Sequence, residues 1–109
     1  MVDVLRYVTK SGLETVRQWL DDLHDPRAAA RIVMRIDRLA KGNFGDCKPL
    51  RDGAWELRID YGPGYRIYYA MVARTCVLLL CGGDKRKQAA DIDRAIEYWR
   101  DYKRRIGKP

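Results

Sequence analysis

Residues 54–81 constrain the fold more than any other part of the chain, because they form three short runs with the side-chain pattern of β-strands. Apolar and polar side chains alternate in 54–60 and in 65–73, and the sequence Gly62-Pro63-Gly64 between them favours a turn. The run 76–81 (CVLLLC) is apolar throughout, which is typical of a strand covered on both faces near the centre of a sheet. These residues therefore predict a hairpin followed by a central strand, with Arg74-Thr75 as the second turn.

The hairpin sorts its side chains into two faces. If its loop has three residues, Asp60 pairs with Arg66 and Arg58 pairs with Tyr68. The side chains that then face the helices are Leu57, Ile59, Ile67 and Tyr69, and those that share the opposite face are Glu56, Arg58, Asp60, Arg66 and Tyr68. A turn at residues 74–75 places Tyr68 opposite Cys81 and Arg66 opposite Gly83, so Arg66 is expected beside the loop 84–87.

The remaining segments complete one small α/β domain (α+β class), spanning residues 1–109. Residues 3–8 alternate as a first strand, and a helix with Thr9 or Ser11 as its cap follows. A second helix is predicted from residue 27 to 41 and a last one from about 88 to 106, while 42–53 is predicted as a loop. The predicted order is β-α-α-β-β-β-α, an antiparallel-rich sheet backed by a helical hairpin and a C-terminal helix.

The excess of basic residues limits the classes of binding partner. The chain has 22 Lys and Arg against 15 Asp and Glu, a formal charge of +7, which favours a polyanion such as nucleic acid or an acidic protein surface. The second predicted helix carries arginines at helical spacing along one side: Arg27, Arg31, Arg35 and Arg38. This stripe is either a solvated face or a surface that docks a phosphate backbone.

Other classes of site find little support in the residues. His24 is the only histidine and no pair of cysteines has metal-ligand spacing, so we expect no metal and no cofactor. Cys76 and Cys81 are expected on opposite faces of one strand, which argues against a disulfide between them. No apolar run approaches a membrane span of about 18 residues, so we expect no membrane contact and a cytoplasmic location.

Charged residues converge where the hairpin meets the segment after the third strand. The strand arginines and the loop Asp84-Lys85-Arg86-Lys87 fall in one patch, an arrangement that specifies an anion site. Cross-strand ion pairs, Asp60 with Arg66 and Glu56 with Arg58, explain the same charges structurally. Gly82-Gly83 favours the first reading, because paired glycines at a strand end allow a ligand close to the backbone or a sharp bend.

The runs WELRIDYGPGYRIYY, LLLCGGDKRKQ and DIDRAIEYW resemble the RelE/ParE toxin superfamily, most closely its HigB-like branch, the addiction module killer proteins of type II toxin–antitoxin systems. The resemblance extends over nearly the whole chain. It implies a RelE-like fold and a toxin that inhibits translation and growth by cleaving mRNA, usually on the ribosome. In such a metal-independent endoribonuclease, or mRNA interferase, the ribose 2′-hydroxyl attacks the adjacent phosphate.

Residue by residue, the resemblance implies that Arg58 and Arg66 hold the scissile phosphate. Lys85 and Lys87 would bind phosphate and stabilise charge, and Asp84 would abstract a proton. The further residues expected to bind RNA are Tyr65 and Tyr68, by stacking on a base, and Arg86, Arg27, Arg31, Arg35 and Arg38. Some relatives use a histidine or a late tyrosine as the acid or base, and this chain has neither after Asp84 until Tyr98.

Two alternatives share the implied fold, because fold alone does not fix function. One is a non-enzymatic ParE-type inhibitor of DNA gyrase, and the other is a nucleic-acid-binding corepressor that acts with its antitoxin. The full set of strand arginines and loop lysines favours the nuclease, since a binder needs no such set. The expected partners are a helix-turn-helix antitoxin, mRNA and the ribosome, with DNA reached only through the antitoxin complex. The antitoxin is expected on the basic sheet face or on the arginine side of the second helix.

Overall fold

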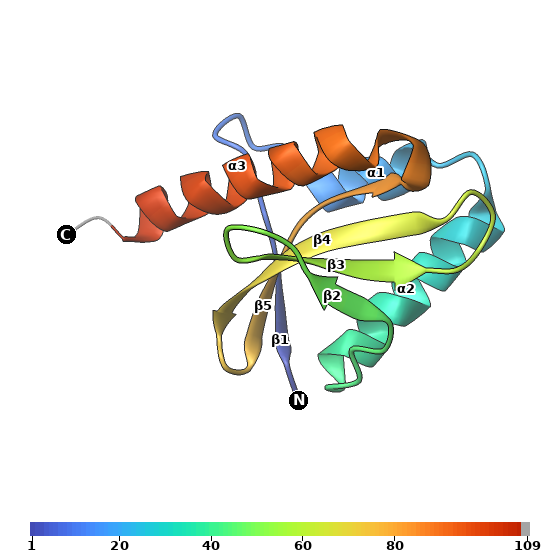
Figure 1. Cartoon of the computed structure of the whole chain (residues 1–109), viewed down its shortest axis with the longest axis horizontal. Helices are drawn as coiled ribbons and strands as arrows, with labels where there is room; N and C mark the ends of the chain where they lie inside the picture. The colour runs from blue at the N-terminus through green and yellow to red at the C-terminus, as the bar shows by residue number, and fades with distance from the viewer. Residues whose placement is uncertain (108–109) are drawn as a thin grey trace.

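The computed structural model describes residues 1–107, which form a five-stranded mixed sheet with helices on both faces (Figure 1). The elements in chain order are β1 (Asp3–Arg6), α1 (Thr15–Asp22), α2 (Pro26–Ala40), β2 (Cys47–Pro49), β3 (Ala54–Ile59), β4 (Tyr65–Ala73), β5 (Cys76–Asp84), a 3-10 turn (Lys85–Lys87) and α3 (Gln88–Ile106). The strands lie in the order β1-β5-β4-β3-β2. Within residues 1–107, only β1 and β5 pair in parallel, so the α+β class and the antiparallel-rich sheet are confirmed.

Strand β5 lies inside the sheet, between β1 and β4, as its apolar sequence predicts. Val77 and Leu79 point to the face covered by α1 and α2, and Leu78 and Leu80 point to the face covered by α3. All four side chains are buried. The continuous apolar run therefore reflects burial on two faces at once.

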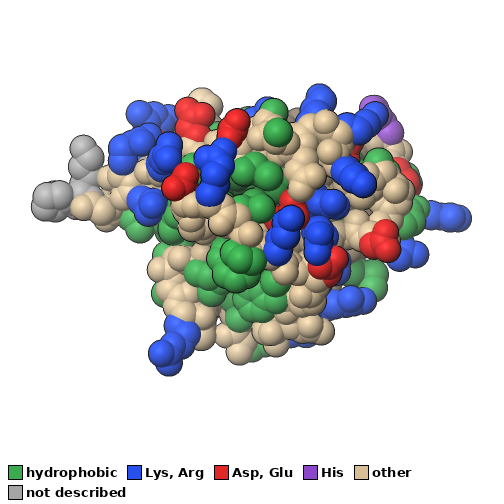
Figure 2. Space-filling view, viewed as in Figure 1, with side chains coloured by type: hydrophobic (Ala, Val, Ile, Leu, Met, Phe, Trp, Pro, Cys, Tyr) green, Lys and Arg blue, Asp and Glu red, His purple; other side chains and the backbone are tan. Residues whose placement is uncertain are grey.

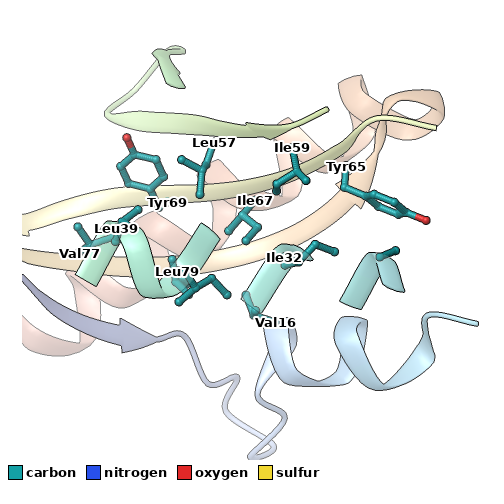
Figure 3. Close-up of a cluster of buried hydrophobic side chains, with 12 residues drawn as sticks. Val16, Ile32, Leu39, Leu57, Ile59, Tyr65, Ile67, Tyr69, Val77 and Leu79 are labelled. Atoms are coloured by element: carbon teal, nitrogen blue, oxygen red, sulfur yellow. The ribbon is translucent and has the colours of Figure 1, made fainter. Parts of the chain in front are cut away.

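The first core layer joins α1 and α2 to the sheet (Figure 3). Val16 of α1 and Ile32 of α2 face Leu57, Ile67 and Leu79 from the strands, and all five are fully buried. Truncating a residue such as Ile32 to alanine is expected to cost about 2–5 kcal/mol, because the removed methyl groups leave a cavity. This layer holds α2, the helix that carries the arginine stripe, against the sheet.

The second core layer lies under α3. Tyr68, Leu78 and Leu80 pack against Ala95, and Tyr7 stacks on Tyr98 with ring centroids 4.6 Å apart. Because α3 runs across this face, Tyr68 has no exposed surface. The face that carries the strand arginines is thus not an open basic surface, because α3 covers it at Tyr68.

The first helix starts later than predicted, since its N-cap is Glu14 and not Thr9 or Ser11, and the second starts at Pro26, one residue before the predicted start. Thr9 does not cap α1: its side chain accepts a hydrogen bond from the backbone N–H of Leu13 within a turn, and the helix begins only at Thr15. Asp25 does cap α2, since its carboxylate accepts from the backbone N–H groups of Arg27 and Ala28. Pro26 occupies the first turn, where its missing N–H costs nothing.

The hairpin register differs from the predicted one by two residues. Arg58 lies opposite Arg66, and Glu56 lies opposite Tyr68, so the predicted pairs Asp60 with Arg66 and Arg58 with Tyr68 are wrong. The faces are unchanged, because a shift of two preserves side-chain direction. The pairings of Tyr68 with Cys81 and of Arg66 with Gly83 are confirmed, as is the turn at residues 74–75.

Three further observations complete the fold. Residues 47–49, predicted as loop, form the edge strand β2, which pairs antiparallel with β3. Among residues 1–107, no helix is long and apolar enough to cross a membrane. Cys47, Cys76 and Cys81 are all free thiols.

Candidate functional site

A pocket of about 460 Å³ opens where the β3–β4 hairpin meets the 3-10 turn after β5. The residues that line it are Asp46, Arg58, Asp60, Gly62, Pro63, Gly64, Arg66 and Lys85. Two of the predicted arginines and one of the predicted lysines therefore share one hollow. In Figure 2, Lys and Arg side chains gather with a few acidic ones beside the central green patch, toward the end of β3.

The loop geometry closes this pocket. Gly64 has a φ of +82°, which favours glycine, and its carbonyl accepts a hydrogen bond of 2.9 Å from the backbone N–H of Lys85. A Cβ at Gly64 would lie 3.4 Å from Nη1 of Arg66. The hairpin loop and the 3-10 turn are thus fastened together, which brings Lys85 to the arginines.

Arg66 is the most buried cation of the pocket, with a side chain 13% exposed. Its Nε lies 3.5 Å from Oε1 of Glu56, and its Nη1 donates to the backbone oxygen of Tyr65 at 3.3 Å. Glu56 is fully buried and accepts a 2.6 Å hydrogen bond from Nε2 of Gln88, the first residue of α3. A buried carboxylate held by α3 therefore fixes the guanidinium from behind.

Arg58 is held from the opposite side. Its Nε and Nη2 both donate to Oδ1 of Asp46, at 3.2 and 3.0 Å, and its side chain is 38% exposed. Arg58 and Arg66 lie directly opposite each other, and like charges in that position repel. Each arginine has a carboxylate partner, which offsets the repulsion. The other charged residues of the lining are Lys85 and Asp60.

The two predicted lysines differ in position. Among residues 1–107, Lys85 and Lys87 form no ion pair, so their ammonium groups are open to a ligand. Lys85 lines the pocket, whereas Lys87 lies outside its lining at the N-terminus of α3. There its charge lowers the pKa of Asp91, although burial is the larger effect and raises it.

Asp84 is engaged by its neighbour Arg86. Its carboxylate accepts from the Arg86 backbone at 2.9 Å and from the guanidinium at 2.7 Å. The side-chain hydrogen bond from Arg86 is the main cause that lowers the pKa of Asp84, and the same bond raises the pKa of Arg86. The geometry is that of a cap on the 3-10 turn, and neither residue lines the pocket.

Neither predicted stacking residue presents an open ring. Tyr65 is 8% exposed and packs edge-on against Trp19, while Tyr68 lies under α3 with its hydroxyl unpaired among the described residues. Burial raises the pKa of both phenols. The stacking role expected for these residues therefore loses its physical basis in this conformation.

The arginine stripe of α2 borders a second hollow of about 650 Å³, which shares Asp46, Arg58 and Asp60 with the first. Arg35 has a structural role, because its guanidinium donates to the backbone oxygens of Phe44, Asp46 and Arg58 at 3.1–3.3 Å. Burial, followed by the nearby Arg38 charge, lowers its pKa. Arg27, Arg31 and Arg38 are exposed and form no ion pair within residues 1–107.

Gly82 and Gly83 serve packing. A Cβ on Gly82 would lie 2.2 Å from Trp19, and one on Gly83 would lie 1.9 Å from Oδ2 of Asp91. Each glycine therefore admits a side chain from one of the two covering layers, which explains the pair without a ligand. The predicted approach of a ligand to this backbone is replaced by contact with Trp19 and Asp91.

Little in the sequence indicates which residues hold the arginines. Glu56 was assigned to the correct face, but its burial depends on α3, and Asp46 lies in a segment read as loop. Asp60 also lines the pocket and forms no ion pair among the described residues. Within residues 1–107, no three His, Cys, Asp or Glu side chains gather in a way that could hold a metal ion.

Comparison with known proteins gives two matches. Residues 18–100 match the family model described as phage derived protein Gp49-like (DUF891). An uncharacterized protein of Haemophilus influenzae is 52% identical over 81 residues, which cover 74% of this chain and 82% of that protein. The matched segment of the family model includes α2, the hairpin, β5 and most of α3.

Proposed function

We propose a function from the premise that this chain belongs to the phage-derived Gp49-like family, which is associated with toxin–antitoxin systems. The chain is the toxin of such a module, and an antitoxin is its partner. Within that class we assign it a metal-independent endoribonuclease activity of the RelE/HigB type, which cleaves mRNA in the cytoplasm, on the ribosome, and stops translation. The antitoxin is a helix-turn-helix protein, and DNA is bound only through the complex.

One observation carries the assignment: Arg58, Arg66 and Lys85 line a single pocket at the end of a rigid hairpin. Arg58 and Arg66 stand directly opposite each other in the hairpin, which brings two guanidinium groups to one place. A phosphate placed between them would receive charge-assisted hydrogen bonds from two guanidinium groups and one ammonium group. The site thus suits the dianionic phosphorane that forms when a 2′-hydroxyl attacks the neighbouring phosphate.

The proposed reaction replaces one oxygen–phosphorus bond with another and moves two protons. The 2′-hydroxyl loses a proton and its oxygen bonds to phosphorus, the 5′-oxygen of the next nucleotide leaves and takes up a proton, and a 2′,3′-cyclic phosphate remains. In the proposal, Arg66 and Arg58 hold the scissile phosphate, Lys85 stabilises the developing charge, and Lys87 attracts the strand from outside the pocket. Asp84 stays the predicted proton acceptor, but its lowered pKa weakens it as a base at neutral pH.

The engagement of Asp84 favours the second candidate, a ParE-type inhibitor that binds DNA gyrase without cleaving RNA. Such a protein needs a cationic surface but no base. The third possibility, a corepressor that contacts nucleic acid only with its antitoxin, needs neither pocket arginine. Transcript cutting separates the nuclease from the other two candidates, and a loss of DNA supercoiling separates the gyrase inhibitor from the corepressor.

The test is to express the chain under tight control, alone and as Arg66→Ala, and to map transcript 5′ ends while measuring growth. The nuclease predicts cuts in phase with codons that disappear in the variant, because the scissile phosphate loses its most buried cation. Arg17→Ala, which removes an exposed arginine of α1, is the matched control and should cut normally. Growth arrest that persists in Arg66→Ala with intact transcripts and reduced DNA supercoiling would favour gyrase inhibition.

A further inference from the structure

The groove along α2 has a composition different from that of the phosphate pocket. Its floor is apolar, formed by Ala30 and Met34 of α2 and by Ile59 of β3. Met34 is 55% exposed and Val33 beside it is 44% exposed, so α2 leaves large apolar surface open. Exposed apolar side chains that line a hollow mark a surface made for contact.

The rim of the same groove is cationic. Arg27, Arg31 and Arg38 stand along it, exposed and free of ion pairs among residues 1–107. Arg31 lies over the ring of Tyr61 at 4.6 Å, which presents its guanidinium at a defined place. The acidic members of the lining are Asp46, which Arg58 engages, and Asp60.

An apolar floor between arginines fits an acidic amphipathic peptide better than RNA. A strand of RNA stacks its bases on aromatic rings, and this lining contains none. A helical peptide segment can place an apolar side chain on Met34 while its carboxylates meet the rim arginines. The cationic rim and the apolar floor are thus complementary to an acidic amphipathic helix.

We propose that the α2 groove, defined by Arg27, Ala30, Arg31, Met34, Arg38 and Ile59, binds an acidic amphipathic segment of the antitoxin. This inference rests on the proposed toxin–antitoxin function. Because the groove shares Asp46, Arg58 and Asp60 with the phosphate pocket, a segment seated in it reaches the wall of that pocket. The bound antitoxin therefore competes with RNA at Arg58 and inhibits the toxin directly.

The test uses the full chain purified together with the product of the adjacent gene. Hydrogen exchange is compared in the free chain and in the complex, and affinity is measured for Met34→Glu and Arg31→Glu. Both side chains are exposed, so the fold should tolerate the changes, which circular dichroism and urea unfolding verify. The matched controls are Leu13→Glu, an apolar side chain 44% exposed, and Arg17→Glu on α1, both outside the groove.

The proposal predicts protection of residues 27–38 in the complex, affinity at least tenfold weaker in both groove variants, and little change in both controls. A complex that forms but protects another surface, with unchanged affinity in the groove variants, overturns the inference and leaves the toxin assignment intact. If a fluorescein-labelled oligoribonucleotide protects residues 27–38 and the partner does not, the groove is an RNA channel and the inference is also wrong. If the two proteins form no complex, the toxin–antitoxin assignment itself falls, whatever the transcript mapping shows.

Discussion

The carboxylate of Glu56 lies 3.5 Å from Nε of Arg66 inside the sheet, and Gln88 of α3 donates to the same carboxylate oxygen. The third helix thereby positions the central cation of the candidate site. A buried ion pair of this kind depends on both partners, because loss of one leaves a buried charge uncompensated. The coupling makes Glu56 a positioning residue for Arg66.

Glu56→Gln removes the negative charge but keeps the size of the side chain. We expect the rate of RNA cleavage to fall about tenfold, since an interaction with a charged group contributes roughly 1.5 kcal/mol or more. Single-turnover cleavage and urea unfolding separate the loss of rate from the loss of stability. Asp46→Asn removes the corresponding partner of Arg58, and because Asp46 is 59% exposed we expect a smaller change in both measurements. Equal effects would contradict the special position of Glu56.

Gly83→Ala is expected to loosen α3. The new Cβ would lie 1.9 Å from Oδ2 of Asp91, so the buried Asp91 side chain, the strand or the first turns of α3 must move. Overpacking of this kind typically costs about 1–3 kcal/mol in the free energy of unfolding. In a double-mutant cycle with Asp91→Ala, the loss should be largely recovered, because the clashing carboxylate is gone. Additive losses would show that Gly83 is needed for another reason.

Side-chain alternation predicted the faces of the hairpin, but not which residues stand opposite each other. Leu57 and Ile67 fix the parity, because a shift of one residue would bury arginines. Alternation does not determine the length of the loop. Gly62 and Gly64 both have positive φ, and β3 ends at Ile59 while β4 begins at Tyr65, so the loop is longer than the predicted three residues. Arg58 consequently faces Arg66, a pairing that a rule based on charge complementarity argues against.

Side-chain alternation also does not predict that α3 covers the second face of the sheet. The pattern around Glu56 and Tyr68 is that of a half-exposed strand, and only the tertiary contacts of α3 bury both residues. Asp46 precedes the edge strand β2, which gives no strand signal because it has three residues, follows Gly45 and ends with Pro49. Local pattern therefore predicted the cations of the pocket, while their carboxylate partners depend on contacts distant in sequence.

The arginine stripe of α2 divides into structural and exposed members. Arg35→Ala should destabilise the protein by about 1.5–3 kcal/mol, because three backbone oxygens lose a charged donor. Arg27→Ala, on the exposed side of the same helix, should change the free energy of unfolding by less than about 0.5 kcal/mol. Urea unfolding of the two variants checks the difference. A large effect of Arg27→Ala would mean that the whole stripe is structural.

The link between Tyr7, which follows β1, and α3 should depend on pH. The hydroxyl of Tyr7 donates to Oδ2 of Asp101 at 2.5 Å, and Arg105 donates to the same oxygen. The Tyr7 hydrogen bond is the main cause that lowers the pKa of Asp101, while burial, followed by Asp101, raises the pKa of Tyr7 to about 12.

A carboxyl with a lowered pKa stabilises the fold above its unfolded pKa of about 4. That contribution disappears as the pH falls through the lower, folded value. We therefore expect Asp101→Asn to be less stable than the natural sequence near pH 7 and the difference to vanish in acid. Urea unfolding at several pH values measures it. A difference that persists at the lowest pH would assign the effect to shape instead of charge.

Salt dependence separates the two loop lysines. Lys85 lines the phosphate pocket and Lys87 does not, although both lie on the same turn and form no ion pair among the described residues. Each phosphate contact made with single-stranded RNA contributes about 0.7 to the slope of log affinity against log salt concentration. Lys85→Gln should lower that slope by about this amount for a labelled oligoribonucleotide and slow its cleavage. Lys87→Gln removes the same charge, but from a position outside the pocket. It should therefore lower the slope less and leave the cleavage step nearly unchanged. If the two variants behaved alike, the lysines would act as a diffuse charge, and the pocket would not be where the phosphate binds.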